Sequence, residues 1–113
     1  MSGAGFADTP SPPYWVVVFT SQRTPDDDAG YAAAAARMVE LTRQSSGFLG
    51  IESARGTDGL GITVCYWDSE AAIAGWRANL EHAEARAQGN ARWYEHYELR
   101  VAKVERAYGG PHR

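Results

Sequence analysis

The chain has 113 residues, the size of one domain, and 44% of them are hydrophobic, which is enough to build a core. Its formal net charge is −3 with no basic block, which argues against a nucleic-acid partner. The single cysteine, Cys65, excludes a disulfide framework and a cysteine metal site within one chain. No run approaches the roughly 20 apolar residues of a membrane span, and the start lacks signal-peptide features. We therefore expect a cytoplasmic protein with no membrane partner.

The segment 1–13 is small, polar and rich in proline, and we expect a flexible tail there. A single folded domain is expected over 14–108, with a short tail at 109–113. Its first strand is predicted at 14–21, where the run YWVVVFTS is β-branched or aromatic.

A helix is predicted to follow the first strand. Thr24 is the expected cap, with Pro25 at the first helical position, and apolar residues recur at helical spacing from Tyr31 onwards. Gly47 is well placed to end this helix in a left-handed turn.

The next elements are predicted to be a β-hairpin, a second helix and a last strand. The runs 48–55 and 61–67 read as the two strands of the hairpin, joined by a glycine-rich turn. The second helix is expected to start at Asp68 or Ser69 and to reach about residue 88. The last strand is predicted at about 94–107, with a bulge near Ala102.

This order of elements is the βαββαβ of the ferredoxin-like α+β fold, with a four-stranded antiparallel sheet. Two helices can cover only one face of such a sheet, yet the first strand is apolar on both. Residues 15, 17 and 19 (Trp, Val, Phe) alternate with residues 14, 16 and 18 (Tyr, Val, Val). Because a sheet face that meets water is usually polar, we expect a second copy of the chain to cover the other face. The predicted assembly is a homodimer of the dimeric α/β barrel type.

The runs SGFLGIES and CYWDSEAAIAGWRANLEH, together with the closing ARWYEHYELRVAKVER, resemble the antibiotic biosynthesis monooxygenase family. The resemblance covers roughly residues 14–107. It implies a ferredoxin-like dimer with a pocket between the helices and the sheet in each subunit. Members of this family oxygenate polyphenols without a cofactor, or bind and cleave haem, and many have no known activity.

Three functions remain open on this basis. The leading hypothesis is a monooxygenase that oxygenates a small aromatic or polyketide-like metabolite without a cofactor, since no dinucleotide motif, metal motif or paired nucleophile stands in the sequence. The first alternative is a haem-binding or haem-degrading monooxygenase with His82 as the iron ligand. The second alternative is a non-catalytic dimer that binds a small hydrophobic molecule or acts as a scaffold.

Trp76 and His82 are the expected catalytic residues. Trp76 lies on the apolar stripe of the second helix, which is typical of core packing, and the resemblance implies that this position also lines the pocket. His82 follows six residues later, about 240° around an unbroken helix, so the two share a face only if the helix bends near Asn79. The resemblance implies an axial ligand to haem iron or a proton-transfer group near position 82.

Further substrate-binding candidates come from the strands. Thr20 is the polar residue nearest to the place where haem-degrading relatives carry an asparagine, which this first strand lacks. Residues around the last strand could pack in the sheet and at a dimer seam, or line the pocket, and Tyr94 and His96 should share a face. Arg23 and Arg55 end their strands and are interpreted as solvated. The candidates for substrate binding are Trp76, Asn79, Tyr66, Thr20, Trp93 and Tyr97.

Overall fold

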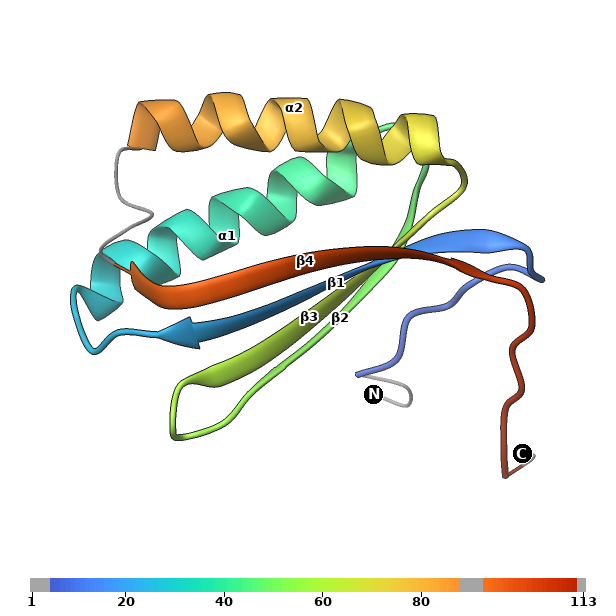
Figure 1. The fold of residues 1–113 in the computed structure, drawn as a ribbon, viewed down its shortest axis with the longest axis horizontal. Helices are drawn as coiled ribbons and strands as arrows, with labels where there is room; N and C mark the ends of the chain where they lie inside the picture. The colour runs from blue at the N-terminus through green and yellow to red at the C-terminus, as the bar shows by residue number, and fades with distance from the viewer. Residues whose placement is uncertain (1–4, 88–92, 112–113) are drawn as a thin grey trace.

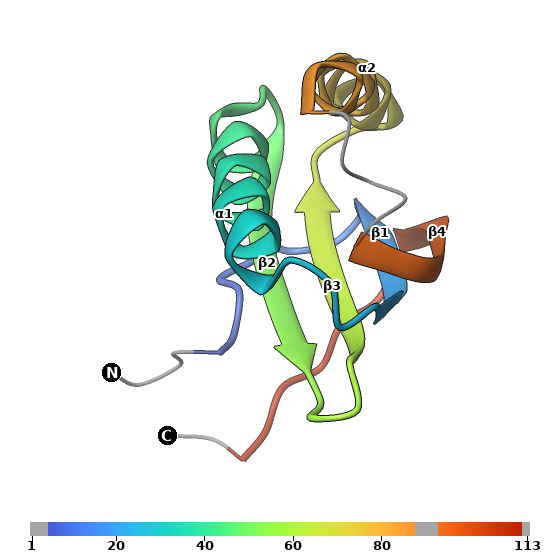
Figure 2. The same ribbon diagram turned by 90° about the vertical axis from the view of Figure 1, so that its left-hand side faces the viewer.

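A computed structural model describes residues 5–87 and 93–111, with the stretch 81–87 described as backbone alone. Its elements are β1 (Tyr14–Arg23), α1 (Asp28–Gln44), β2 (Phe48–Arg55), β3 (Leu60–Trp67), α2 (Glu70–Ala87) and β4 (Tyr94–Val104). The strands pair antiparallel in the order β2-β3-β1-β4, and both helices lie on one side of the sheet (Figure 1 and Figure 2). The ferredoxin-like α+β prediction is confirmed.

The first helix begins later than predicted. Its N-cap is Asp27, in the left-handed region at φ 53°, whose side chain accepts a hydrogen bond from the Gly30 N–H at 3.2 Å. Thr24, the predicted cap, lies before the helix, and its N–H donates to the Trp93 carbonyl at 2.8 Å. Arg23 and Thr24 thus tie the end of β1 to the segment before β4, and the helix begins beyond these contacts.

The connection from α1 to β2 holds the start of α2 as well. Gly47 has φ +86°, which confirms the predicted left-handed turn, and its carbonyl accepts from the Asp68 N–H at 2.9 Å. Ser69 caps α2, since its Oγ accepts from the Ala72 N–H at 3.1 Å. The turn after α1 and the start of α2 thus form one packed corner.

The core lies between the sheet and α2. It contains the buried side chains of Val17, Cys65, Trp67, Ile73 and Trp76. The Trp67 and Trp76 rings have centroids 5.0 Å apart, and the Trp67 side chain is 0% exposed. Burying an apolar side chain of the size of Val or larger stabilises the fold by about 1.5–3 kcal/mol each.

The start of β4 is irregular, and this changes which side chains face the helices. Arg23 pairs with Tyr94 whereas Gln22 pairs with His96, so Glu95 is an extra residue on β4. The prediction that Tyr94 and His96 share a face is therefore wrong. The predicted bulge near Ala102 is also wrong, because Ala102 pairs regularly with Val16.

The face of the sheet opposite the helices, called here the open face, carries several apolar side chains. Tyr14, Val16 and Val18 of β1 lie there, beside Leu60 and Ile62 of β3. The segment before β1 crosses one side of this face, where the Ala7 N–H donates to Glu52 Oε2 at 2.9 Å (Figure 1). Ile62 remains 45% exposed. No helix in the described part of the chain has the length and hydrophobicity needed to cross a membrane.

Candidate functional site

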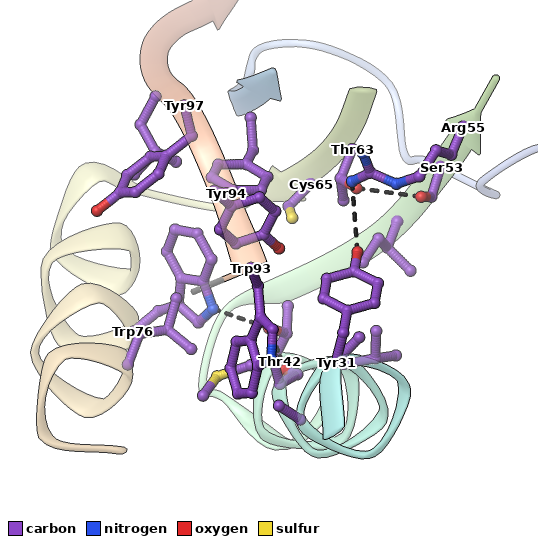
Figure 3. Close-up of a pocket in the computed structure, with 18 of the residues that line it drawn as sticks. Tyr31, Thr42, Ser53, Arg55, Thr63, Cys65, Trp76, Trp93, Tyr94 and Tyr97 are labelled. Carbon is purple, nitrogen blue, oxygen red and sulfur yellow. Dashed lines mark hydrogen bonds between the residues drawn. The ribbon is translucent and has the colours of Figure 1, made fainter. Parts of the chain in front are cut away.

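A cavity of about 360 Å³ lies between the two helices and the sheet. Every helix and strand contributes to its lining, which is mostly aromatic and aliphatic with a few polar groups (Figure 3). This size and composition are typical of sites for small organic molecules.

An aromatic cluster from β1 and β4 forms one wall. The Phe19 ring lies 5.7 Å from the Tyr94 ring and 5.4 Å from the Tyr97 ring, measured between centroids, and the two tyrosine rings are 5.8 Å apart. The extra residue in β4 directs Tyr94 toward the helices, so that both tyrosines of the strand reach the cavity. Such a wall suits a flat ring, because offset and edge-to-face contacts between aromatic groups are favourable.

Trp76 of α2 lines the cavity and is fixed by α1. Its Nε1–H donates to Thr42 Oγ1 at 2.9 Å, and the Thr42 hydroxyl donates in turn to the Met38 carbonyl at 2.7 Å. The indole is 5% exposed and packs on Trp67. This bond joins the two helices and sets the orientation of the indole plane in the cavity wall.

The polar end of the cavity is built around Tyr31 of α1. Arg55 Nη2 donates to the Tyr31 hydroxyl at 3.3 Å and to Ser21 Oγ at 2.8 Å (Figure 3 labels Arg55 and Tyr31). The Arg23 guanidinium lies over the Tyr31 ring, 3.9 Å from its centroid, and forms an ion pair with Asp28 at 2.8 Å. The Arg23 side chain is only 8% exposed, so its interpretation as solvated is wrong.

Three uncharged groups lie on the sheet side of the cavity, two hydroxyls and one thiol. The Ser53 and Thr63 hydroxyls are hydrogen-bonded to each other at 3.1 Å across β2 and β3. Burial raises the pKa of the Cys65 thiol to about 12. Because the thiolate is the nucleophilic form, Cys65 is an inert thiol in this setting.

Three of the sequence candidates line the cavity, namely Trp76, Trp93 and Tyr97. The position of Trp93 is fixed by its carbonyl, which accepts from Arg23 Nη1 at 2.9 Å and from the Thr24 N–H at 2.8 Å. The sequence left pocket lining open for Trp93 and Tyr97, and the geometry favours it over packing alone.

The other candidates lie elsewhere. Thr20 and Tyr66 are on the open face, since they alternate with Phe19 and Cys65, and the Tyr66 hydroxyl donates to Glu52 Oε1 at 2.7 Å. Asn79 is exposed on α2 and is not among the lining residues. His82 belongs to α2, and its side chain lies outside the described residues.

Four polar residues line the cavity although the sequence did not place them among the substrate-binding candidates, namely Tyr31, Thr42, Arg55 and Tyr94. A period of two along β2 places Arg55 on the same face as Ser53 and Ile51, which was a usable signal. Tyr31 was visible on the apolar stripe of α1. Tyr94 could not be placed, because its direction depends on the bulge.

The four-stranded antiparallel sheet, with an aromatic cavity beneath two helices, places the chain among the ferredoxin-like α+β proteins. The family model described as "Antibiotic biosynthesis monooxygenase" matches residues 15–88, well over half of the chain. The chain belongs to the antibiotic biosynthesis monooxygenase family, as its sequence predicts.

The chain is also similar to proteins from several bacteria. The chain is 52% identical over 98 residues to the uncharacterized protein YqjZ of Bacillus subtilis (strain 168), covering 87% of this chain and 85% of that one. Its fold matches protein SO0527 from Shewanella oneidensis with a TM-score of 0.70 at 16% identity, over 88% and 100% of the two chains. It also matches SnoaB, a cofactor-independent oxygenase from Streptomyces nogalater, with a TM-score of 0.65 at 17% identity, over 85% and 97%.

The haem alternative gains no support from these findings. It depends on His82, whose side chain is not described, and no relative reported above is described as a haem protein. Among the side chains that the structure describes, no three His, Cys, Asp or Glu residues gather in a way that could hold a metal ion.

Proposed function

We propose that this protein is a monooxygenase that oxygenates a small flat aromatic or polyketide-like molecule in the cavity, without a cofactor. The observation that carries the proposal is the cavity itself. Its volume is about 360 Å³, and aromatic side chains from α2 and β4 surround it with only a few polar groups between them. Family membership and the resemblance of the fold to SnoaB, described as a cofactor-independent oxygenase, point the same way.

The chemistry of an anthrone-type substrate shows what the protein would have to supply. Loss of a ring C–H proton gives a delocalised anion, which passes one electron to O₂, and the resulting pair combines through a new C–O bond. The hydroperoxide takes up a proton and then loses water, as its O–O bond and the second C–H bond break, to leave a C=O group. One O₂ is consumed, and one oxygen atom ends in the product and the other in water. The protein therefore needs to hold the ring, move protons and stabilise an anion.

In this proposal Trp76 holds the ring and His82 moves the proton. The indole of Trp76, oriented by Thr42, forms part of the wall against which a flat ring would stack. His82 is proposed to accept the substrate proton, since histidine changes its protonation state near neutral pH.

The test is oxygen uptake with anthrone in the presence of a chelator, measured against the spontaneous rate. We expect one O₂ consumed for each anthraquinone formed, at a rate above the spontaneous one. His82→Gln should lower kcat by about 100-fold or more, as expected for loss of a general base. His96→Gln is the matched control, because His96 faces the opposite side of the sheet, and it should retain the wild-type rate.

Two results would contradict the oxygenase proposal. Anthrone that binds in the cavity but is oxidised only at the spontaneous rate would identify a non-catalytic binding protein. Equal losses in the two histidine variants would remove His82 from the mechanism.

We also propose that the protein is a homodimer joined through the open face. The support is the set of apolar side chains that the helices do not cover, including Val16, Val18, Leu60 and Ile62. A face of this kind marks an interaction surface in soluble proteins.

A further inference from the structure

The described side chains that line the cavity include two arginines, Arg55 and Arg77, and no carboxylate. The chain as a whole has the opposite balance, with fourteen acidic against eleven basic residues. Both arginines are exposed residues, so this positive charge lies at the edge of the cavity in a negatively charged protein. An anionic ligand would gain more from it than an uncharged one.

Arg55 is held in place by uncharged groups. Among the described residues its guanidinium donates to the Ser21 hydroxyl and carbonyl, to the Gly59 carbonyl and to the Tyr31 hydroxyl. None of these acceptors neutralises the charge, in contrast to Arg23, which is paired with Asp28. The charge of Arg55 is therefore not neutralised by these partners, and it lies beside the Tyr31 hydroxyl.

The backbone of the neighbouring strand makes room for this guanidinium. Gly61 lies opposite Arg55 in the β2–β3 register, and a Cβ added to Gly61 would stand 2.4 Å from Arg55 Cζ. The guanidinium therefore lies flat on a glycine, against the buried hydroxyl of Ser21. Arg55 is an exposed residue, as its interpretation as solvated predicts, and these contacts hold its guanidinium at the edge of the cavity.

The two tyrosine hydroxyls complete the group. Burial, followed by a hydrogen bond with the Tyr31 hydroxyl, raises the pKa of Tyr94, while the charges of Arg55 and Arg23 act in the opposite direction. Arg55 Nη2 donates to the Tyr31 oxygen at 3.3 Å, so the Tyr31 hydroxyl keeps its own proton as a donor toward a ligand in the cavity.

We infer that Tyr31, backed by Arg55, donates a hydrogen bond to an anionic phenol or enol oxygen of a planar aromatic ligand in the cavity. Tyr31 is the binding group that touches the ligand, and Arg55 is a positioning residue that polarises the Tyr31 hydroxyl. The inference rests on the proposed function, since it names the form of the substrate that the same cavity takes. It narrows that substrate to a compound with an acidic ring hydroxyl or enol, whose ionised form is the one that reacts with O₂.

The test measures the ionisation of a bound probe and needs no turnover. The probe is 7-hydroxycoumarin, a flat phenol whose ionised form absorbs at longer wavelength than the neutral form, titrated with pH in the presence of excess wild-type protein. An apolar cavity alone would raise the pKa of the bound phenol. A donor aimed at its oxygen should instead lower this pKa by about one relative to the free probe, a roughly tenfold preference for the anion.

Variants show which residues lower the pKa of the bound probe. Tyr31→Phe removes only the hydroxyl and should abolish the lowering. Arg55→Met should reduce it, and so should Gly61→Ala, which displaces the guanidinium while keeping its charge in the protein. Arg37→Met, at an exposed position of α1 outside the cavity lining, is the matched control and should bind the probe as the wild type does.

The possible failures separate the two proposals. A bound probe whose pKa is unchanged or raised in the wild type overturns the anion site, while the cavity still holds a flat ring as the proposed function requires. A lowering that persists in Tyr31→Phe also overturns it. 7-Methoxycoumarin, the methyl ether of the probe, has no hydroxyl to ionise and tests the cavity alone. If neither compound binds, the cavity is not a site for flat aromatic molecules, and both proposals fall.

Discussion

At the scale of single residues, the two tryptophans of the core differ in what surrounds them. Trp67 is completely buried, and its Nε1–H has no acceptor among the described residues. Trp76 has an acceptor in Thr42 and presents part of its ring to the cavity. The first is a packing residue with one unsatisfied donor, and the second combines packing with a cavity surface.

Substitution to phenylalanine should separate these roles. Trp76→Phe loses one hydrogen bond, worth about 1 kcal/mol, and keeps the fold, but it should weaken binding of 7-methoxycoumarin. Trp67→Phe removes packing volume from a closed site and should lower Tm while leaving coumarin affinity nearly unchanged. Thermal unfolding and fluorescence titration of both variants measure this. If both substitutions lower Tm equally and neither changes affinity, the spacing of the two tryptophans is purely structural.

At the scale of elements, the strands and helices were predictable because their signals are local. The hairpin and α2 follow from alternation and helical spacing, and Gly47 from the need for a left-handed turn. The start of α1 was not predictable, because the Thr24 N–H is bonded to the carbonyl of Trp93, far away in the chain.

Tyr94 escaped prediction for a related reason, whereas Tyr97 of the same aromatic wall was among the candidates. Alternation along a strand predicts which face a residue lies on only while the strand pairing is regular. The extra residue Glu95 breaks this regularity, so Tyr94 and His96 lie on opposite faces of the sheet. Trp76 was found because helical spacing identifies it as a buried residue and the family resemblance implies that its position lines the pocket. Thr20 and Tyr66 were placed in the site by the resemblance and by residue type, although strand alternation puts them on the open face.

The corner between α1, β2 and α2 supports a prediction on glycine. A Cβ at Gly47 would meet Ala72 Cβ and Asp68 Oδ1, each at 2.5 Å, in a backbone conformation that other residues avoid. Gly47→Ala should therefore lower the free energy of unfolding by more than about 1 kcal/mol. The same change at Gly75, in the exposed interior of α2 with no atom within 4 Å, should raise it by about 0.5–1 kcal/mol. Urea titration of both variants measures these free energies of unfolding. Two changes of the same sign would contradict the prediction.

At the scale of the whole molecule, the sheet has one face covered by helices and one that carries uncovered apolar groups. Val17 points into the core, whereas its neighbour Val16 lies on the open face. Only a partner surface would bury the second set, and two copies of the same face can do this around a twofold axis.

A pair of charge substitutions tests this assembly. Ile62 on the open face and Val101 on the helix-facing side of β4 are 45% and 46% exposed, so either could hold a glutamate in an isolated monomer. Sedimentation should show a dimer for the wild type down to micromolar concentrations. Ile62→Glu should abolish the dimer and, with it, stable folding, because the charge would be buried at the interface. Val101→Glu should remain dimeric. A folded wild-type monomer on dilution, or equal effects of the two substitutions, would contradict the proposed interface.

The cavity draws its lining from every helix and strand of the fold, and for this reason ligand binding should raise the stability of the whole domain. An unfolded or partly unfolded chain cannot assemble such a surface, so a ligand binds the native state alone and adds its binding energy to the whole fold. At a ligand concentration 100 times Kd this adds about 2.7 kcal/mol, and in a domain of about 100 residues each kcal/mol raises Tm by about 4–8 °C. Melting curves recorded across a collection of metabolites would therefore rank candidate substrates before any reaction has been observed.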